Sequence, residues 1–172
     1  MYSRALTEAM EMLSLDRRTI FVGQAVAYDG QAAFRTFAKV PMGKRLEMPV
    51  VEDFQMGFCT GLSLVGLIPV CFYPRMDFLI IAANQLLNHL DKIPLMGAFR
   101  PKVIIRVAVG RSTPLDPGPQ HVQDYAHALD AMLHTVRVVT LEDAHAVKRR
   151  YREALESKHS TILVERMSLY DL

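Results

Sequence analysis

The stretch Pro49–Tyr73, PVVEDFQMGFCTGLSLVGLIPVCFY, decides the fold class. It predicts a helix from about Phe54 to Val65, a break at Gly66, and a short apolar strand from Ile68 to Phe72. A helix of this length beside a short buried strand is typical of the repeating unit of a parallel sheet that is covered by helices.

The same alternation continues on both sides of this stretch. Toward the N-terminus we expect a helix over Ala5 to Leu13 and a strand over Thr19 to Val22. Toward the C-terminus we expect helices over Phe78 to Leu90, Asp124 to Leu133 and Asp143 to Leu155, and strands over Val103 to Val109, Val136 to Leu141 and Thr161 to Glu165. The pattern predicts an α/β fold with three layers, α/β/α, and a mostly parallel sheet, formed by residues 1–172 as a single domain.

Two segments are expected to be loops. Ala25 to Glu47 has weak periodicity and predicts a connection with a short helix around Gln31 to Ala38, and Arg111 to Gln120 is rich in Pro and Gly. Ligands in such folds collect where strands end and lead into helices. The candidate ligand loops are therefore the one that carries Glu52 and the one that carries His121.

Composition excludes several classes of function. The 20 basic and 18 acidic residues are interspersed, so no basic stripe fits a nucleic acid. The longest apolar run, Gly61 to Tyr73, is too short to cross a bilayer, and Met1 to Leu13 lacks the apolar core of a secretion signal. Cys59 and Cys71 lack the spacing of a metal or redox motif. We expect a cytoplasmic protein with no nucleic-acid partner, no membrane and no metal ligands of its own.

The start of the helix after Val51 carries unusual residues. Glu52 and Asp53 could simply favour the helix N-terminus, by roughly 0.3–1 kcal/mol. Gly57 and Gly61 share one helix face, where each costs ~1 kcal/mol relative to alanine. Something is expected to approach that face closely, either the sheet of this domain, or another helix or a ligand.

Glu52–Gly61 resembles the E-x4-G-hydrophobic-x-x-G signature of pyrimidine-binding domains in thiamine diphosphate enzymes. Three surrounding stretches look like blocks of the β subunit of pyruvate and branched-chain 2-oxo acid dehydrogenases: Pro49–Glu52, Gly66–Val70, and Asp77-Phe78 with Asn84-Gln85, Asn88 and Lys92. Gly118–His121 is similar to the histidine-bearing loop of that family and of transketolases. The resemblance extends over nearly the whole chain.

The resemblance implies thiamine diphosphate as cofactor and assigns roles to three residues. Glu52 matches the glutamate whose carboxyl binds the pyrimidine ring nitrogen and drives the aminopyrimidine toward its imino tautomer. Phe78 matches an aromatic residue that packs on the pyrimidine, although a core phenylalanine is an equal alternative. His121 matches a histidine that reaches the reacting substrate. The remaining histidines lack such context and are expected on the surface or on helices: His89, His127, His134, His145 and His159.

The chain also departs from the family pattern. The acidic pair that follows the family's first strand is replaced by Gln24-Ala25. The chain has no Gly-Asp-Gly with a downstream asparagine, which holds Mg²⁺ on the diphosphate in this family. The resemblance therefore implies a homo- or hetero-oligomer with a diphosphate-binding partner subunit that carries the Gly-Asp-Gly motif and Mg²⁺.

The implied reaction is cleavage next to a carbonyl, in a 2-oxo acid by a dehydrogenase or decarboxylase, or in a ketose by a transketolase-type enzyme. Two other interpretations remain open at this point. One is a non-catalytic interaction or regulatory module derived from the same fold. The other is an unrelated flavodoxin-like domain that binds a different ligand.

Overall fold

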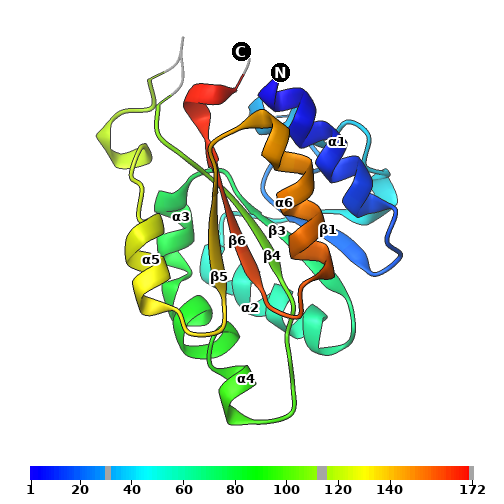
Figure 1. Cartoon of the computed structure of the whole chain (residues 1–172), viewed down its shortest axis with the longest axis vertical. Coiled ribbons are helices and arrows are strands. Elements are labelled where there is room, and N and C mark those ends of the chain that lie inside the picture. The colour runs from blue at the N-terminus through cyan, green and yellow to red at the C-terminus, as the bar shows by residue number, and fades with distance from the viewer. Residues whose placement is uncertain (30–31, 112–115, 171–172) are drawn as a thin grey trace.

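The computed structural model describes residues 1–29, 32–111 and 116–170 (Figure 1). The strands are β1 (Thr19–Gly23), β2 (Arg45–Glu47), β3 (Ile68–Tyr73), β4 (Ile104–Val109), β5 (Arg137–Leu141) and β6 (Thr161–Arg166). The α-helices are α1 (Tyr2–Ser14), α2 (Glu52–Leu64), α3 (Met76–Ile81), α4 (Ile93–Met96), α5 (Ala126–Met132) and α6 (Ala144–Glu156). Shorter helical elements are η1 (Ala32–Phe37), η2 (Met42–Lys44), the π-helix η3 (Gln85–Leu90), η4 (Pro119–His121) and η5 (Met167–Leu169).

The six strands form one sheet in the order β2-β1-β3-β4-β6-β5, and every pair in it is parallel. Every residue of β3 and β4 is buried. This burial explains why both strands read as continuous apolar runs rather than as alternating ones. The predicted parallel sheet is confirmed.

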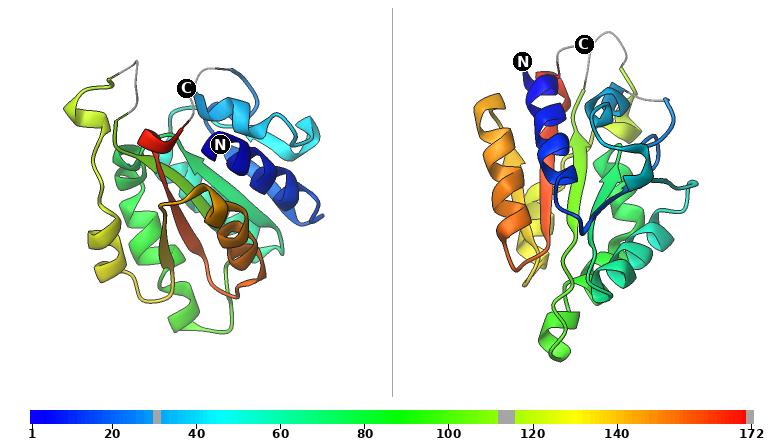
Figure 2. Two further views of the ribbon diagram at one scale, coloured as in Figure 1. Left: turned by 45° about the horizontal axis from the view of Figure 1, so that its top comes forward. Right: turned by 90° about the vertical axis from the view of Figure 1, so that its right-hand side faces the viewer.

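Helices cover both faces of the sheet. The right panel of Figure 2 shows α1 and α6, in blue and orange, on one side of the sheet and the cyan and green helices α2 and α3 on the other. The first side is filled by a cluster that includes Leu6, Phe37 and Tyr151, and the second by one that includes Met56, Leu79 and Leu129. The predicted three-layer α/β/α architecture is confirmed. None of the described helices has the length and apolarity that a membrane crossing requires.

Two local predictions need correction, and one helix is additional to those expected. Strand β2 lies in the segment that is expected to be a loop with a short helix. Its three residues are only half-buried, so the sequence shows almost no strand pattern there. Helix α4 was not predicted. The single helix expected over Phe78 to Leu90 is instead α3, a tight turn at Ala82 and the π-helix η3, in which Asp91 N donates to Leu86 O.

The expected short helix around Gln31 to Ala38 corresponds to η1, although Gln31 lies outside the described residues. So do residues 112–115 of the second predicted loop. The remaining expected helices and strands are present with ends shifted by one or two residues, apart from α1, which begins three residues before the expected start.

The order of the strands creates a switch point. The chain passes from β1 to the edge strand β2 and then returns through α2 to β3, on the other side of β1. In open parallel sheets, ligands bind outside the carboxyl ends of the strands at such a reversal. The topology therefore favours a site beyond the ends of β1 and β3.

Candidate active site

The residues singled out from the sequence gather at the switch point. Gln24 directly follows β1, Glu52 is the first residue of α2, and Phe78 lies in α3, which follows β3. Helix α3 contacts both α2 and η4, and η4 ends with His121. The fold thus brings Glu52, Phe78 and His121 to the same edge of the sheet.

Glu52 is buried at the start of α2, with 6% of its surface exposed. The side-chain amide of Gln24 donates to Glu52 Oε1 over 3.4 Å. The hydroxyl of Tyr73 donates to the backbone carbonyl of Glu52 over 2.9 Å. Burial, reinforced by the nearby thiols and Glu52, raises the pKa of Tyr73 well above its usual value, so Tyr73 stays a neutral donor. Glu52 therefore has a fixed backbone and a side chain beside the switch point.

Phe78 and His121 are in direct contact. Their ring centroids lie 5.4 Å apart with an angle of 76° between the planes, an edge-to-face arrangement. Residues at the start of α3 also contact Gly110 and Tyr125, which lie before and after His121 in the sequence. Arg75 Nη1 donates to Gly110 O over 2.8 Å, and Tyr125 N lies 2.9 Å from Met76 Sδ. The turn that leads into Phe78 thereby positions the segment that carries His121.

The two glycines of α2 have different surroundings. A Cβ at Gly57 would lie 3.2 Å from Oε1 of Gln85, so this glycine lets η3 pack closely on α2. Gln85 also bonds Asp53, with Nε2 to Oδ2 at 3.4 Å. A Cβ at Gly61 would meet no described atom of this chain within 4 Å. The expected close approach is thus present at Gly57, whereas the face at Gly61 is open.

Glu47 at the end of β2 has a structural role that sequence patterns do not reveal. Its carboxylate accepts hydrogen bonds from three successive backbone N–H groups, those of Ala25, Val26 and Ala27. This contact holds the turn that carries Gln24. A lone glutamate at the end of a three-residue strand leaves no readable sequence pattern.

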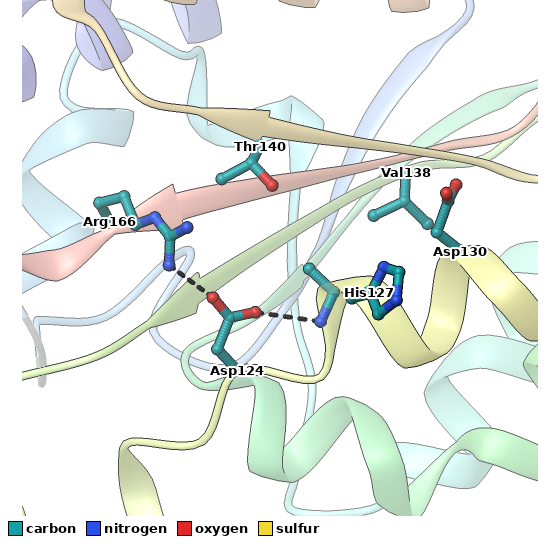
Figure 3. A pocket seen from close by; sticks show the side chains of 7 residues that line it. Asp124, His127, Asp130, Val138, Thr140 and Arg166 are labelled. Atoms are coloured by element: carbon teal, nitrogen blue, oxygen red, sulfur yellow. Dashed lines mark hydrogen bonds and ion pairs between the residues drawn. The ribbon is translucent and has the colours of Figure 1, made fainter.

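A separate cavity of about 420 Å³ opens between α5, strand β5 and the end of β6 (Figure 3). His127 and Asp130 project into it from α5, and Asp124 forms an ion pair of 2.5 Å with Arg166. His127 is exposed on α5, and His89, His134, His145 and His159 are exposed too, as expected for these five histidines. The lining of this cavity includes none of Glu52, Phe78 and His121.

Two observations concern possible ligands. Within residues 1–29, 32–111 and 116–170, no group of three or more His, Cys, Asp or Glu side chains is arranged to hold a metal ion. In the same ranges, Oδ2 of Asp77, the neighbour of Phe78 in α3, is buried without a hydrogen-bond partner. The hydroxyl of Thr161 is the other buried side-chain atom without a partner in these ranges, and it lies in β6, away from Phe78.

No protein-family model matches the chain. The chain is similar to pyruvate dehydrogenase E1 component subunits beta. It is 24% identical to that of Chlorokybus atmophyticus over 177 residues, covering 98% of this chain and 50% of the relative. It is 28% identical to the mitochondrial subunit of Caenorhabditis elegans over 170 residues, covering 96% and 48%. The chain spans about half the length of the curated relatives that it matches.

Solved structures share the fold. A structure described as a split gene transketolase, inactive beta4 tetramer, matches with a TM-score of 0.75 and 22% identity, over 96% of this chain and 51% of that one. A transketolase from Campylobacter jejuni matches with a TM-score of 0.73 and 12% identity, over 97% and 26%. The resemblance stated from the sequence is confirmed by both comparisons.

Proposed function

We propose that this chain, which is similar to pyruvate dehydrogenase β subunits and has the fold of transketolases, is the pyrimidine-binding part of a thiamine diphosphate enzyme. The observation that carries the proposal is the buried carboxyl of Glu52 at the first residue of α2, beside the switch point of the sheet. An acid in that place fits a heterocycle with a basic ring nitrogen.

The side chains at this place suit the pyrimidine end of the cofactor. Glu52 would bind the pyrimidine ring nitrogen and move a proton at its carboxyl, and Phe78 would pack against the ring. The unpartnered Oδ2 of Asp77 offers an acceptor beside Phe78. When bound, thiamine diphosphate supplies a nucleophilic carbon that adds to the carbonyl of the substrate.

His121 would act on the substrate side of the site. Its contact with Phe78 places the imidazole next to the proposed pyrimidine platform, where it can hold or shuttle a proton. Gly110 and Tyr125, which lie on either side of His121 in the sequence, are hydrogen-bonded to Arg75 and Met76. The proposed division of roles is therefore Glu52 on the cofactor and His121 on the substrate.

The rest of the active site is assigned to a partner. In this proposal a subunit with the Gly-Asp-Gly motif holds the diphosphate and Mg²⁺, and the substrate is a 2-oxo acid or a ketose. The described β-subunit relatives and the split gene transketolase support a two-chain enzyme of this type. A cytoplasmic location remains part of the proposal, although some relatives are described as mitochondrial or chloroplastic.

Calorimetric titration of thiamine diphosphate with Mg²⁺ tests this division of labour. The chain alone should bind weakly or not at all, and the complex with a Gly-Asp-Gly partner should bind at low micromolar or better. Tight, Mg²⁺-dependent binding by the chain alone would contradict the proposed division. A stable complex that binds no cofactor would favour a non-catalytic module.

A further inference from the structure

The turn from Gly23 to Ala27, at the end of β1, is tightly constrained by its neighbours. A Cβ at Gly23 would lie 2.4 Å from the backbone oxygen of Phe72, so only glycine fits there without displacing β3. Ala25 has a φ of +55°, a left-handed conformation that a residue with a side chain rarely adopts. Such a conformation persists only where surrounding contacts enforce it, and it often marks a functional position.

The enforcing contact is the carboxylate of Glu47. It accepts from the N–H groups of Ala25 over 2.5 Å, Val26 over 3.0 Å and Ala27 over 2.7 Å. Three charge-assisted hydrogen bonds on one carboxylate are a strong restraint. The backbone on one side of Gln24 is thus fixed by β3, and that on the other side by β2.

Gln24 lies between the two constrained residues, Gly23 and Ala25. Its side chain reaches Glu52, the acid that is proposed to bind the cofactor. Gln24 Nε2 donates to Glu52 Oε1 over 3.4 Å. A carboxamide donates a hydrogen bond but does not gain or lose a proton near neutral pH. It can therefore orient the carboxyl of Glu52 without sharing a proton with it.

The other groups around Glu52 lie on several elements. From β3, the Tyr73 hydroxyl binds the Glu52 backbone carbonyl, and Cys71 lies next to Tyr73. From α2 itself, Asp53 is bonded to Gln85 of η3, and Cys59 faces Cys71. Of these neighbours, Tyr73 bonds the backbone of Glu52, whereas Gln24 bonds its carboxyl group.

We propose that Gln24 is a positioning residue that occupies one oxygen of Glu52, turns the other toward the pyrimidine, and keeps the Glu52 proton from passing to a second acid of this chain. The role in activating the cofactor rests on the proposed function, whereas the coupling between the two side chains does not. A carboxyl in place of this amide would make a pair that shares one proton.

Carbon-13 NMR titration of the Glu52 side-chain carboxyl in the full chain tests the coupling without cofactor or partner. The Glu52 signal is assigned by its loss in Glu52→Gln. Gln24→Met keeps the size of the side chain and removes the donor, so the titration midpoint should rise by about half a pH unit or more. Gln24→Glu should give a two-step titration whose upper step is raised by about one unit or more.

Glu47→Gln provides a second route to the same contact, because it loosens the turn and leaves Gln24 in place. It should raise the midpoint in the same direction as Gln24→Met. Midpoints in all three variants that match the wild type, in chains whose amide spectra show an intact fold, would overturn the coupling.

Turnover of the assembled enzyme distinguishes the positioning role of Gln24 from the proposed function of Glu52. Gln24→Glu should move the high-pH limb of turnover upward by about one unit, and an unmoved limb would overturn the positioning role. If Glu52→Gln leaves turnover unchanged, the proposed function fails, while the result of the carboxyl titration still stands.

Discussion

The edge of one aromatic ring meets the face of the other where His121 contacts Phe78, with centroids 5.4 Å apart. The two residues lie on η4 and α3, which follow neighbouring strands of the sheet. Neither ring is fully buried, so each keeps a surface for a ligand. This contact would couple the platform for the cofactor to the histidine for the substrate.

Phe78→Ala should therefore weaken binding of thiamine diphosphate to the assembled complex by about tenfold, because the packing of a ring on the pyrimidine is worth roughly 1 kcal/mol beyond the area that it buries. Titration calorimetry measures the effect. Phe99→Ala is the matched control, since Phe99 is 66% exposed and lies outside the site. An unchanged dissociation constant in Phe78→Ala would return Phe78 to the role of a core residue.

Asp91 is a buried carboxylate that joins the end of η3 to the chain before β5. Its Oδ1 accepts from the N–H groups of His134, Thr135 and Val136, and its Oδ2 lies 2.6 Å from Lys92 Nζ. Burial opposes the charge, but the hydrogen bonds from Lys92 and these N–H groups outweigh it and hold the pKa of Asp91 well below its usual value.

A depressed carboxyl pKa stabilises the folded state above the unfolded pKa of about 3.9 and loses that contribution as the pH falls below it. Asp91→Asn should cost about 2–4 kcal/mol at pH 7 and progressively less below pH 4. Urea unfolding at pH 7 and pH 3 measures this, with the exposed Asp130→Asn as control. An equal cost at both pH values would show that the charge of Asp91 contributes nothing.

The open face of α2 predicts an interface. Gly61 shares this face with Phe54 and Val65, which are 60% and 78% exposed. Under the proposed function, another subunit approaches here, because glycine lets helices pack closely. Gly61→Leu should disrupt assembly and leave the circular dichroism of the chain unchanged. Gly43→Leu, also in open space, should leave both the assembly and the circular dichroism unchanged. Light scattering decides, and an intact assembly in Gly61→Leu would place the interface elsewhere.

The sequence predicts the layers and the parallel sheet because helix and strand periods are strong over long segments such as Phe54 to Tyr73. It misses β2, whose three residues pair with β1 but are too few to show a period. It also misses the π-helix. The apolar spacing of Met76 to Leu90 suits a regular helix, and the bond from Asp91 N to Leu86 O depends on how Asp91 is held by residues before β5.

Only part of the candidate site can be predicted from the sequence. Glu52, Phe78 and His121 stand in motifs, so a resemblance can point to them, and their assigned roles remain predictions. Gln24 is visible from sequence only as a departure from a pattern. Its contact with Glu52 depends on the turn that Gly23, Ala25 and Glu47 enforce, and this is a property of the folded chain.

The most direct test of the account is the rate at which Glu52→Gln exchanges the proton at the reactive thiazolium carbon, followed by NMR in the assembled complex together with turnover. Glutamine is nearly the same size and cannot exchange the proton, so both rates should fall by roughly 10²–10⁴-fold. Asp53→Asn, the next residue of the same helix end, should leave both nearly unchanged and controls for an effect on the helix N-terminus. Exchange at the wild-type rate in Glu52→Gln would contradict the central claim and remove Glu52 from the mechanism.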